Sequence, residues 1–212
     1  MLLKGGVNMD RASLKNWAKE KIKGHILELI IPIVIASVLT SLTIGAHAGY
    51  DANGNYSYSA GYNLGIFLYF VQVGLAYFMV NFINDQPHEI KDLFKFSSEY
   101  VRTFLTGLLS KIFIGLWTLL LIVPGIMKAY GYALIDLILI NDKYKDLGYM
   151  DLLKKSEEIM NGHKMDLFLL DLSFIGWHIL SVFTCGILEV WVLPYHTTAR
   201  YKFMDDLMKA AN

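Results

Sequence analysis

Long apolar runs without charged residues dominate the pattern of this chain. Asp, Glu, Lys and Arg are absent from residues 29–50 and 52–84, and shorter charge-free runs cover 112–127, 172–188 and 190–199. A helix needs about 20 mostly apolar residues to cross a hydrocarbon layer of ~30 Å, because each residue adds ~1.5 Å. The pattern therefore predicts an all-α fold, built as a polytopic bundle of transmembrane helices.

Six transmembrane helices in three hairpins account for these runs. Their expected bounds are 26–46, 64–84, 103–123, 126–141, 166–184 and 187–203. They form a single integral membrane domain over residues 1–212. A soluble helical bundle with an apolar core is the alternative, but two charge-free stretches of more than 20 residues in so short a chain argue against it.

Three amphipathic helices are predicted beside the hairpins, at 10–24, 87–101 and 147–161. In the first of them, Leu14 and Trp17 recur at helical spacing while the lysines face away. Basic polar faces opposite aromatic or leucine-rich faces suit helices that lie in the inner headgroup layer of a membrane. The alternative is that these helices pack on protein as a cytoplasmic collar.

The basic residues are unevenly placed along the chain. Seventeen of the nineteen lie in four segments, 1–25, 85–102, 142–165 and 200–212, and the loop from 47 to 63 has none. Six spans alternate so that these four segments share one side of the membrane. An excess of Lys and Arg marks that side as cytoplasmic, so we expect a multi-pass protein of the cell membrane with both termini in the cytoplasm.

Composition narrows the classes of function. Nineteen basic residues balance nineteen acidic ones, which indicates no nucleic-acid partner. The single cysteine, Cys185, cannot form an internal disulfide, and hydrophobic residues make up 55% of the chain. No phosphate-binding loop, nucleophile elbow or HExxH motif occurs, and the six histidines lack the close spacing of a zinc site. We therefore expect no cofactor, no metal and no catalytic site.

A helix–Gly-His–helix pattern occurs twice. Gly24-His25 is followed three residues later by Glu28, and Gly162-His163 is followed three residues later by Asp166. The spacing predicts a degenerate internal repeat in which each glycine ends a helix. An enzyme that acts on a lipid headgroup with these histidines and acids is an alternative to a non-enzymatic protein, although acids and histidines at an interface usually only extend toward water.

Charged residues inside the predicted spans are the candidate functional groups, because such residues are costly and usually paired. If Pro124-Gly125 is the tip of a hairpin, Lys111 lies thirteen residues before the tip and Asp136 twelve after it. The count predicts that Lys111 pairs with Asp136, with Asp171 at a similar depth.

Two further groups are expected to match nearer the outer side, Lys128 and Glu189. Asp171 and His178 are seven residues apart, as are Glu189 and His196, so each pair lies nearly on one helical face. One explanation of these charged residues is that they form two buried ion pairs, which fix the register of the helices. The alternative is that they line a polar track for protons or a cationic solute.

Several stretches resemble one known family. They are Asp10–Lys15 with Ala18-Lys19 and Lys23-Gly24, Leu116–Ile126 with its Val-Pro-Gly, Lys154-Lys155-Ser156 with Met160–Lys164, Leu170–Trp177, and Pro194-Tyr195 with Ala199-Arg200. Together they resemble bacterial membrane proteins of domain-of-unknown-function family 975. His25-Ile26 departs from the Asn-Trp common there. A fainter likeness extends to the membrane domain of some glycerophosphodiester phosphodiesterases, which does not carry their catalytic site. The resemblance implies six spans and brings no catalytic residues.

These observations favour a non-enzymatic membrane module that binds a protein, peptide or lipid partner. The outer loop would expose a contact surface formed by Tyr50, Tyr56, Tyr58 and Tyr62, since tyrosine gives a large contact area with few torsions to fix. An interfacial aromatic belt explains the same tyrosines. The alternative function is a small transporter or channel that uses Lys111, Asp136 and Asp171. Membrane lipids are expected partners, and a homo-oligomer is compatible with either function.

Overall fold

A computed structural model describes residues 10–41, 43–44, 47–50, 56–59 and 62–211, and their side chains except those of 43–64, 66, 119–120 and 122. Helices make up nearly all of this described part, and the strands are four short ones between residues 43 and 63. The predicted all-α class is therefore confirmed. The short strands were not predicted, although Tyr56-Ser57-Tyr58-Ser59 alternates as a strand does.

The described elements follow one another as a series of short and long helices. Their bounds are α1 Arg11–Lys21, α2 Ile26–Thr40, β1 Thr43–Ile44, β2 His47–Tyr50, β3 Tyr56–Ser59, β4 Tyr62–Asn63, η1 Leu64–Leu68, α3 Tyr69–Ile83, η2 Ile90–Glu99, α4 Tyr100–Leu120, α5 Ile122–Gly131, α6 Ile135–Leu139, η3 Asp142–Tyr144, α7 Tyr149–Ile159, α8 Lys164–Leu172, α9 Ile175–Phe183 and α10 Glu189–Ala211. The elements written η are 3₁₀ helices.

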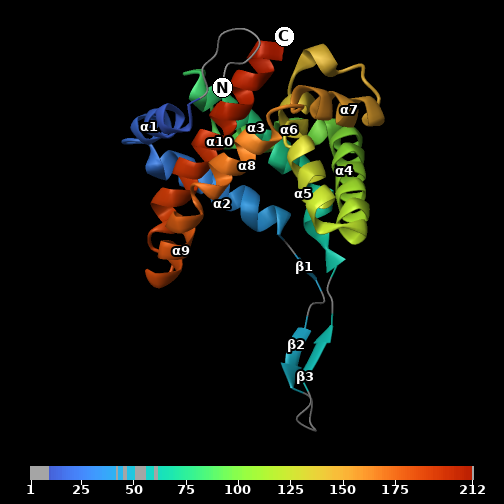
Figure 1. The fold of residues 1–212 in the computed structure, drawn as a ribbon, viewed down its shortest axis with the longest axis horizontal. Helices are drawn as coiled ribbons and strands as arrows, with labels where there is room; N and C mark the ends of the chain where they lie inside the picture. Colours follow the sequence, from blue (N-terminus) through green and yellow to red (C-terminus); the bar gives the residue numbers. More distant parts are fainter. Residues whose placement is uncertain (1–9, 42, 45–46, 51–55, 60–61, 212) are drawn as a thin grey trace.

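The helices pack side by side, with α10 inside the group and in contact with α1, α2, α3, α8 and α9 (Figure 1). The carboxyl end of α10, helix α1 and helix α7 lie at one end of the molecule, and the tip between α4 and α5 lies toward the other. The antiparallel pair β2–β3 extends away from the helices at that second end, with Tyr50 paired to Tyr56 and Ala48 to Tyr58. The core between the helices contains Phe78, Leu29 and Ile138.

A helix forms in each of the six long apolar segments, but two of these segments are broken. Residues 132–134 separate α5 from α6, and residues 173–174 separate α8 from α9. By length and apolar composition alone, one described helical stretch, Lys164–Phe183, is sufficient to cross a membrane. The pair α1 and α2 adds a second if it is counted as one span, although it is bent by 104°.

The predicted hairpin tip at Pro124-Gly125 is wrong. The chain turns at Leu121, whose backbone is extended (φ −157°, ψ 133°), and α5 begins at the next residue. Proline is tolerated in the first turn of a helix because the N–H groups there lack intrahelical partners, so Pro124 fits inside α5. A methyl group at Gly125 would lie 2.1 Å from the Thr118 hydroxyl oxygen, so this glycine brings α5 against α4.

Helices also form in the three short segments beside the hairpins, where amphipathic helices are predicted. Each packs against one of the longer helices: α1 on α10, η2 on α3 and α7 on α4. In α1 the apolar residues Leu14 and Ala18 are buried against protein. In α1 this packing agrees with the collar alternative, whereas Ile90 and Phe94 of η2 stay 46% and 45% exposed.

The two Gly-His units share one backbone geometry. Gly24 and Gly162 have positive φ angles of 81° and 85°, and each precedes the histidine at the start of the next helix. His25 Nδ1 lies 2.7 Å from a carboxylate oxygen of Glu28, and His163 Nδ1 lies 3.4 Å from one of Asp166. The predicted repeat is therefore present in local structure.

We expect Gly74→Ala to destabilise the protein. A methyl group at Gly74 would lie 2.1 Å from the carbonyl oxygen of Leu93, so η2 and α3 would have to separate. Overpacking of this kind costs about 1–3 kcal/mol. Gly115→Ala is the matched control, since Gly115 also lies in a helix and nothing is within 4 Å of the added methyl. Thermal unfolding of the purified variants tests this, and equal midpoints would contradict the close contact.

Candidate functional site

One face of α10 carries three polar side chains, Glu189, His196 and Arg200. Their spacing of seven and four residues places them in line along the helix, over roughly 16 Å. The helix lies against α8 and α9, each of which contributes one partner, Asp171 and His178. The sequence had indicated a shared face within each helix, and the structure brings the two faces together.

These side chains form a continuous series of hydrogen bonds, called here the polar chain (Glu189, His178, His196, Asp171). Glu189 Oε1 lies 3.0 Å from His178 Nδ1, and His178 Nε2 lies 3.1 Å from His196 Nδ1. His196 Nε2 then lies 2.9 Å from Asp171 Oδ1. Both nitrogens of both rings are therefore engaged, and the members alternate between α10 and its two neighbours.

Asp171 is the most heavily bonded member of the polar chain. Its second oxygen, Oδ2, accepts a hydrogen bond from the Tyr130 hydroxyl at 3.0 Å and forms an ion pair with Arg200. Its side chain is 15% exposed, whereas those of Glu189 and Arg200 are 35% and 34% exposed. The polar chain is thus most enclosed at its Asp171 end and more open at its Glu189 end.

Phe174 covers one side of the polar chain. Its ring stacks on the His196 imidazole, with centroids 4.6 Å apart at 18°. Lys15 of α1 also reaches Phe174, with Nζ 4.4 Å from the Phe174 ring centroid and 3.2 Å from the Ser173 carbonyl oxygen to which it donates. Partial burial lowers the pKa of Lys15. The break between α8 and α9 is thereby tied to the first helix of the chain.

The predicted pairing of Lys128 with Glu189 is wrong. Lys128 forms its ion pair with Glu157 of α7, and Glu189 bonds His178. Glu157 lies outside the predicted spans, so a search limited to intramembrane charges could not find it. The aromatic rings of Trp117 and Tyr132 lie 5.6 and 5.7 Å from Lys128 Nζ, which gives the cation further partners.

The predicted ion pair of Lys111 with Asp136 is absent from the described residues. Asp136 instead accepts a hydrogen bond from the Tyr69 hydroxyl at 2.6 Å, and Lys111 is exposed and within 4.0 Å of no described carboxylate. The turn at Leu121 explains the error. Lys111 is ten residues before this turn and Asp136 fifteen after it, and the two charges interact only beyond ion-pair distance.

Other candidate residues fall in separate places. The side chains of Tyr50, Tyr56, Tyr58 and Tyr62 lie outside the described part of the structure, which gives only their backbone in β2, β3 and β4. Glu28 is bonded by His25 and also by His88 Nε2, at 2.7 Å, a partner that the sequence did not indicate. Within the described residues, no group of three or more His, Cys, Asp or Glu side chains is placed to hold a metal ion.

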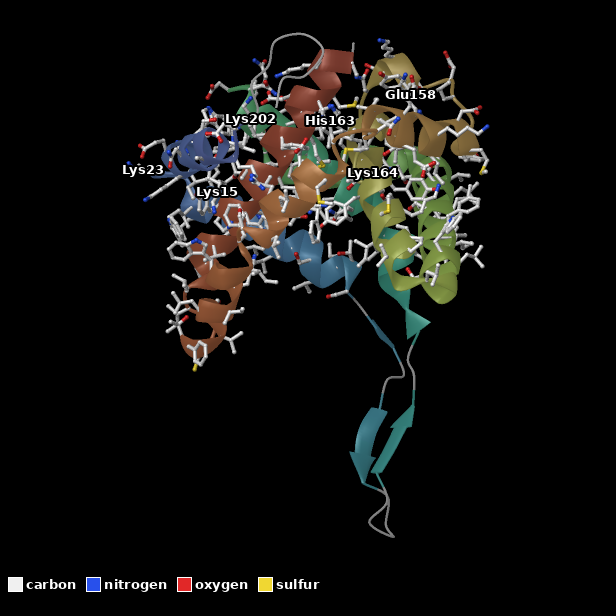
Figure 2. The ribbon with its side chains drawn as sticks, viewed as in Figure 1. Lys15, Lys23, Glu158, His163, Lys164 and Lys202 are labelled. Carbon is white, nitrogen blue, oxygen red and sulfur yellow. The ribbon has the colours of Figure 1, made fainter. Side chains whose placement is uncertain are left out.

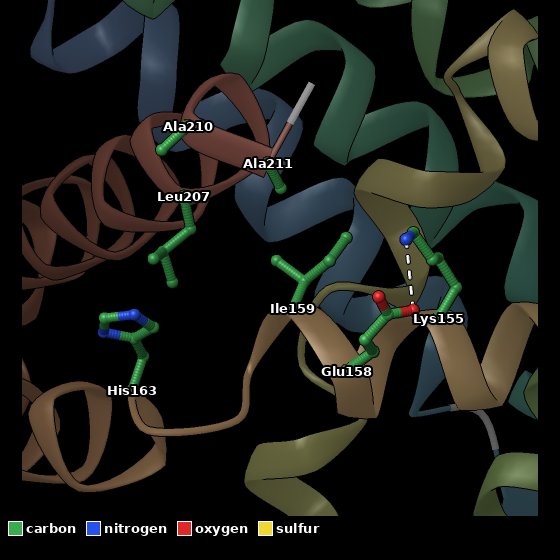
Figure 3. A pocket seen from close by; sticks show the side chains of 7 residues that line it. All are labelled: Lys155, Glu158, Ile159, His163, Leu207, Ala210 and Ala211. Atoms are coloured by element: carbon green, nitrogen blue, oxygen red, sulfur yellow. Dashed lines mark hydrogen bonds and ion pairs between the residues drawn. The ribbon is translucent and has the colours of Figure 1, made fainter. Parts of the chain in front are cut away.

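A pocket opens between α7, the Gly162 turn and the carboxyl end of α10, with a volume of about 280 Å³ (Figure 3). Ile159, Leu207 and the two terminal alanines of α10 supply apolar walls, and His163 faces them from the start of α8. Lys155 and Glu158 form an ion pair of 3.1 Å at the rim. The pocket therefore offers an apolar surface beside groups of both charges.

We expect Asp171→Asn and Arg200→Met each to destabilise the protein, because each change leaves its partner's charge unpaired in a partly enclosed site. The double variant should lose less than the sum of the single losses, by about 1 kcal/mol, which is typical of residues in contact. Chemical unfolding of the four proteins measures this difference. Asp171→Asn with Lys91→Met is the control, and its effects should add, because Lys91 forms its ion pair with Glu89. Additive losses at Asp171 and Arg200 would show that their pairing does not contribute.

Comparison with known proteins gives one match. The family model described as "Protein of unknown function (DUF975)" matches residues 119–211. The match includes the Pro-Gly and Gly-His-Lys stretches, the polar chain and the pocket, whereas the amino-terminal residues that suggested the same family lie outside it. No curated protein matches, and no solved structure matches. The carboxyl-terminal part of the chain, residues 119–211, is therefore similar to the family of proteins of unknown function DUF975.

Proposed function

We propose that the chain is a multi-pass membrane protein with six spans and both termini in the cytoplasm, and that it binds a partner protein through the pocket of Figure 3. The observation that carries the membrane part is the exposure of large apolar side chains on the outside of the helices. On α9, Ile179, Val182 and Phe183 are 55%, 76% and 80% exposed. On α4 and α5, Leu116 and Val123 are 52% and 67% exposed.

Few single helices are long and apolar enough to cross a membrane, because several of the apolar segments are broken or include charged residues. The segment after Leu121 is divided between α5 and α6, and α10 joins an apolar first half to a charged second half. Helix α3 has 15 residues but continues from η1, so that residues 64–83 form one helical segment. Pairs of short helices in sequence cross a layer as one long helix does, provided that their freed backbone groups are satisfied within the protein.

The distribution of basic residues supports the orientation. Lys15, Lys23, Lys164 and Lys202 all lie in the half of the molecule that holds α1, α7 and the end of α10 (Figure 2). The tip of α4–α5, the turn after α9 and the strands β2 and β3 lie toward the opposite end. An excess of Lys and Arg favours the cytoplasmic side for the first half.

The pocket supports a binding role over catalysis. It combines apolar walls with one ion pair and one histidine. Such a lining suits a peptide segment that carries an apolar side chain and a carboxylate. His163 is already bonded to Asp166 within its own unit. The pocket opens on the proposed cytoplasmic side, where a partner protein can reach it.

The native cysteine tests the orientation. Cys185 is exposed in the turn between α9 and α10, on the proposed outer side. An impermeant maleimide applied to intact cells should label the unmodified protein. Variants that carry Cys185→Ser together with Lys95→Cys or Lys154→Cys should react only after the cells are opened. The reverse pattern would place the termini outside.

The binding role is tested by a photo-crosslinking side chain placed at Ala210, in the pocket wall, and at Lys23 as a control on the same side. A crosslinked product should form from position 210 in cells and not from position 23, because only the first lies in the pocket. Adding His163→Ala should remove the product. Products that are identical at both positions, or unchanged by His163→Ala, would rule out specific binding there.

A further inference from the structure

The polar chain has an unusual hydrogen count. It contains three hydrogen bonds in series, and each one needs a single hydrogen between its two atoms. Two neutral imidazole rings supply only two hydrogens, and ionised carboxylates supply none. One additional proton is therefore needed to complete the series, held by a ring or by a carboxyl group at one end.

Two arrangements of these three hydrogens use the same heavy-atom positions. In the first, Glu189 is protonated and donates to His178 Nδ1, His178 Nε2–H donates to His196 Nδ1, and His196 Nε2–H donates to Asp171. In the second, Asp171 is protonated and donates to His196 Nε2, His196 Nδ1–H donates to His178 Nε2, and His178 Nδ1–H donates to Glu189. Each hydrogen crosses one bond between the two arrangements, and the net result moves one proton from Glu189 to Asp171.

The surroundings suit a transfer along this line. Phe174 stacks on His196, so one face of the central ring is covered by an apolar group. Arg200 and the Tyr130 hydroxyl both contact Asp171 Oδ2, which leaves Oδ1 for His196. Arg200 balances a negative charge at this end while the proton is elsewhere. Glu189, at one end of the line, is 35% exposed, and Asp171, at the other end, is 15% exposed beside Arg200, which is 34% exposed.

We propose that Glu189, His178, His196 and Asp171 form a proton-transfer path through the carboxyl-terminal half of the protein. Histidine serves as a proton shuttle because either ring nitrogen can take up or release a proton. After Asp171 releases its proton, the path is ready again when both rings regain their first tautomers. The path rests on the proposed membrane embedding and is independent of binding at the pocket.

The full chain reconstituted in phosphatidylcholine–phosphatidylglycerol vesicles tests the path. A pH dye inside the vesicles reports proton entry driven by a potassium diffusion potential. The wild-type protein should carry protons faster than protein-free vesicles, and Glu189→Gln or His196→Gln should return the rate to the protein-free value. Glu189→Gln keeps hydrogen-bonding atoms at a partly exposed position but cannot release a proton. His88→Gln, which makes the same chemical change at a histidine bonded to Glu28 outside the path, should leave the rate unchanged.

Each other outcome overturns the path. Wild-type flux equal to that of empty vesicles, or equal flux in the wild type, Glu189→Gln and His196→Gln, would exclude it. Resistance of the protein to alkaline extraction from the same vesicles shows whether it is embedded, and extraction would overturn the membrane proposal together with the path. Nitrogen NMR of histidine-labelled protein gives a separate measure: His178 Nε2 and His196 Nδ1 should share one proton, and the finding of both nitrogens bare would contradict the hydrogen count.

Discussion

A partly buried carboxylate, Asp171, sets the arrangement of the carboxyl-terminal half. Its two oxygens accept bonds from three residues on two other helices, Tyr130 of α5 and His196 and Arg200 of α10. A carboxylate removed from water is costly unless charged and hydrogen-bonding partners replace the solvent. The positions of α5, α8 and α10 relative to one another satisfy that requirement, and His178 extends the same bonding to α9.

This constraint also explains why α8 and α9 meet at a break. Ser173 and Phe174 interrupt the helix immediately after Asp171, and the Ser173 hydroxyl donates to the carbonyl oxygen of Leu170. The break turns Phe174 onto the His196 ring and exposes the Ser173 carbonyl oxygen to Lys15. The amino-terminal helix is thus part of the support of a site that lies mostly in the other half of the chain.

Sequence reasoning predicted the features that depend on neighbouring residues. The positions of the helices follow from apolar runs, and the two Gly-His units follow from the local chemistry of helix ends. The alignment of Glu189 with His196 on α10 follows from helical periodicity.

Contacts between side chains on different helices could not be predicted in the same way, because the identity of each partner depends on where each turn lies. Reading Pro124-Gly125 as a turn displaced every depth counted from it, and the pairing of Lys111 with Asp136 was lost with it. Glu157, Arg200 and Tyr130 were missed because they become neighbours of the candidate charges only when the helices pack. The strands β2 and β3 were missed because the alternating stretch Tyr56-Ser57-Tyr58-Ser59 was interpreted only as a contact surface of tyrosines.

The glycine contacts have a consequence for how the protein tolerates sequence change. At Gly74 and Gly125 successive elements meet with almost no side chain between them, so the smallest addition, one methyl group, alters the joint, whereas the surrounding apolar residues can be exchanged for others of similar size. The carboxyl-terminal helices meet through hydrogen-bonded polar groups, where size matters less than the ability to donate or accept. Substitutions that conserve volume should therefore be neutral in the region of residues 64–131 and harmful along α8, α9 and α10, and substitutions that conserve polarity should show the opposite pattern. The two halves of one helical bundle thus tolerate different kinds of substitution.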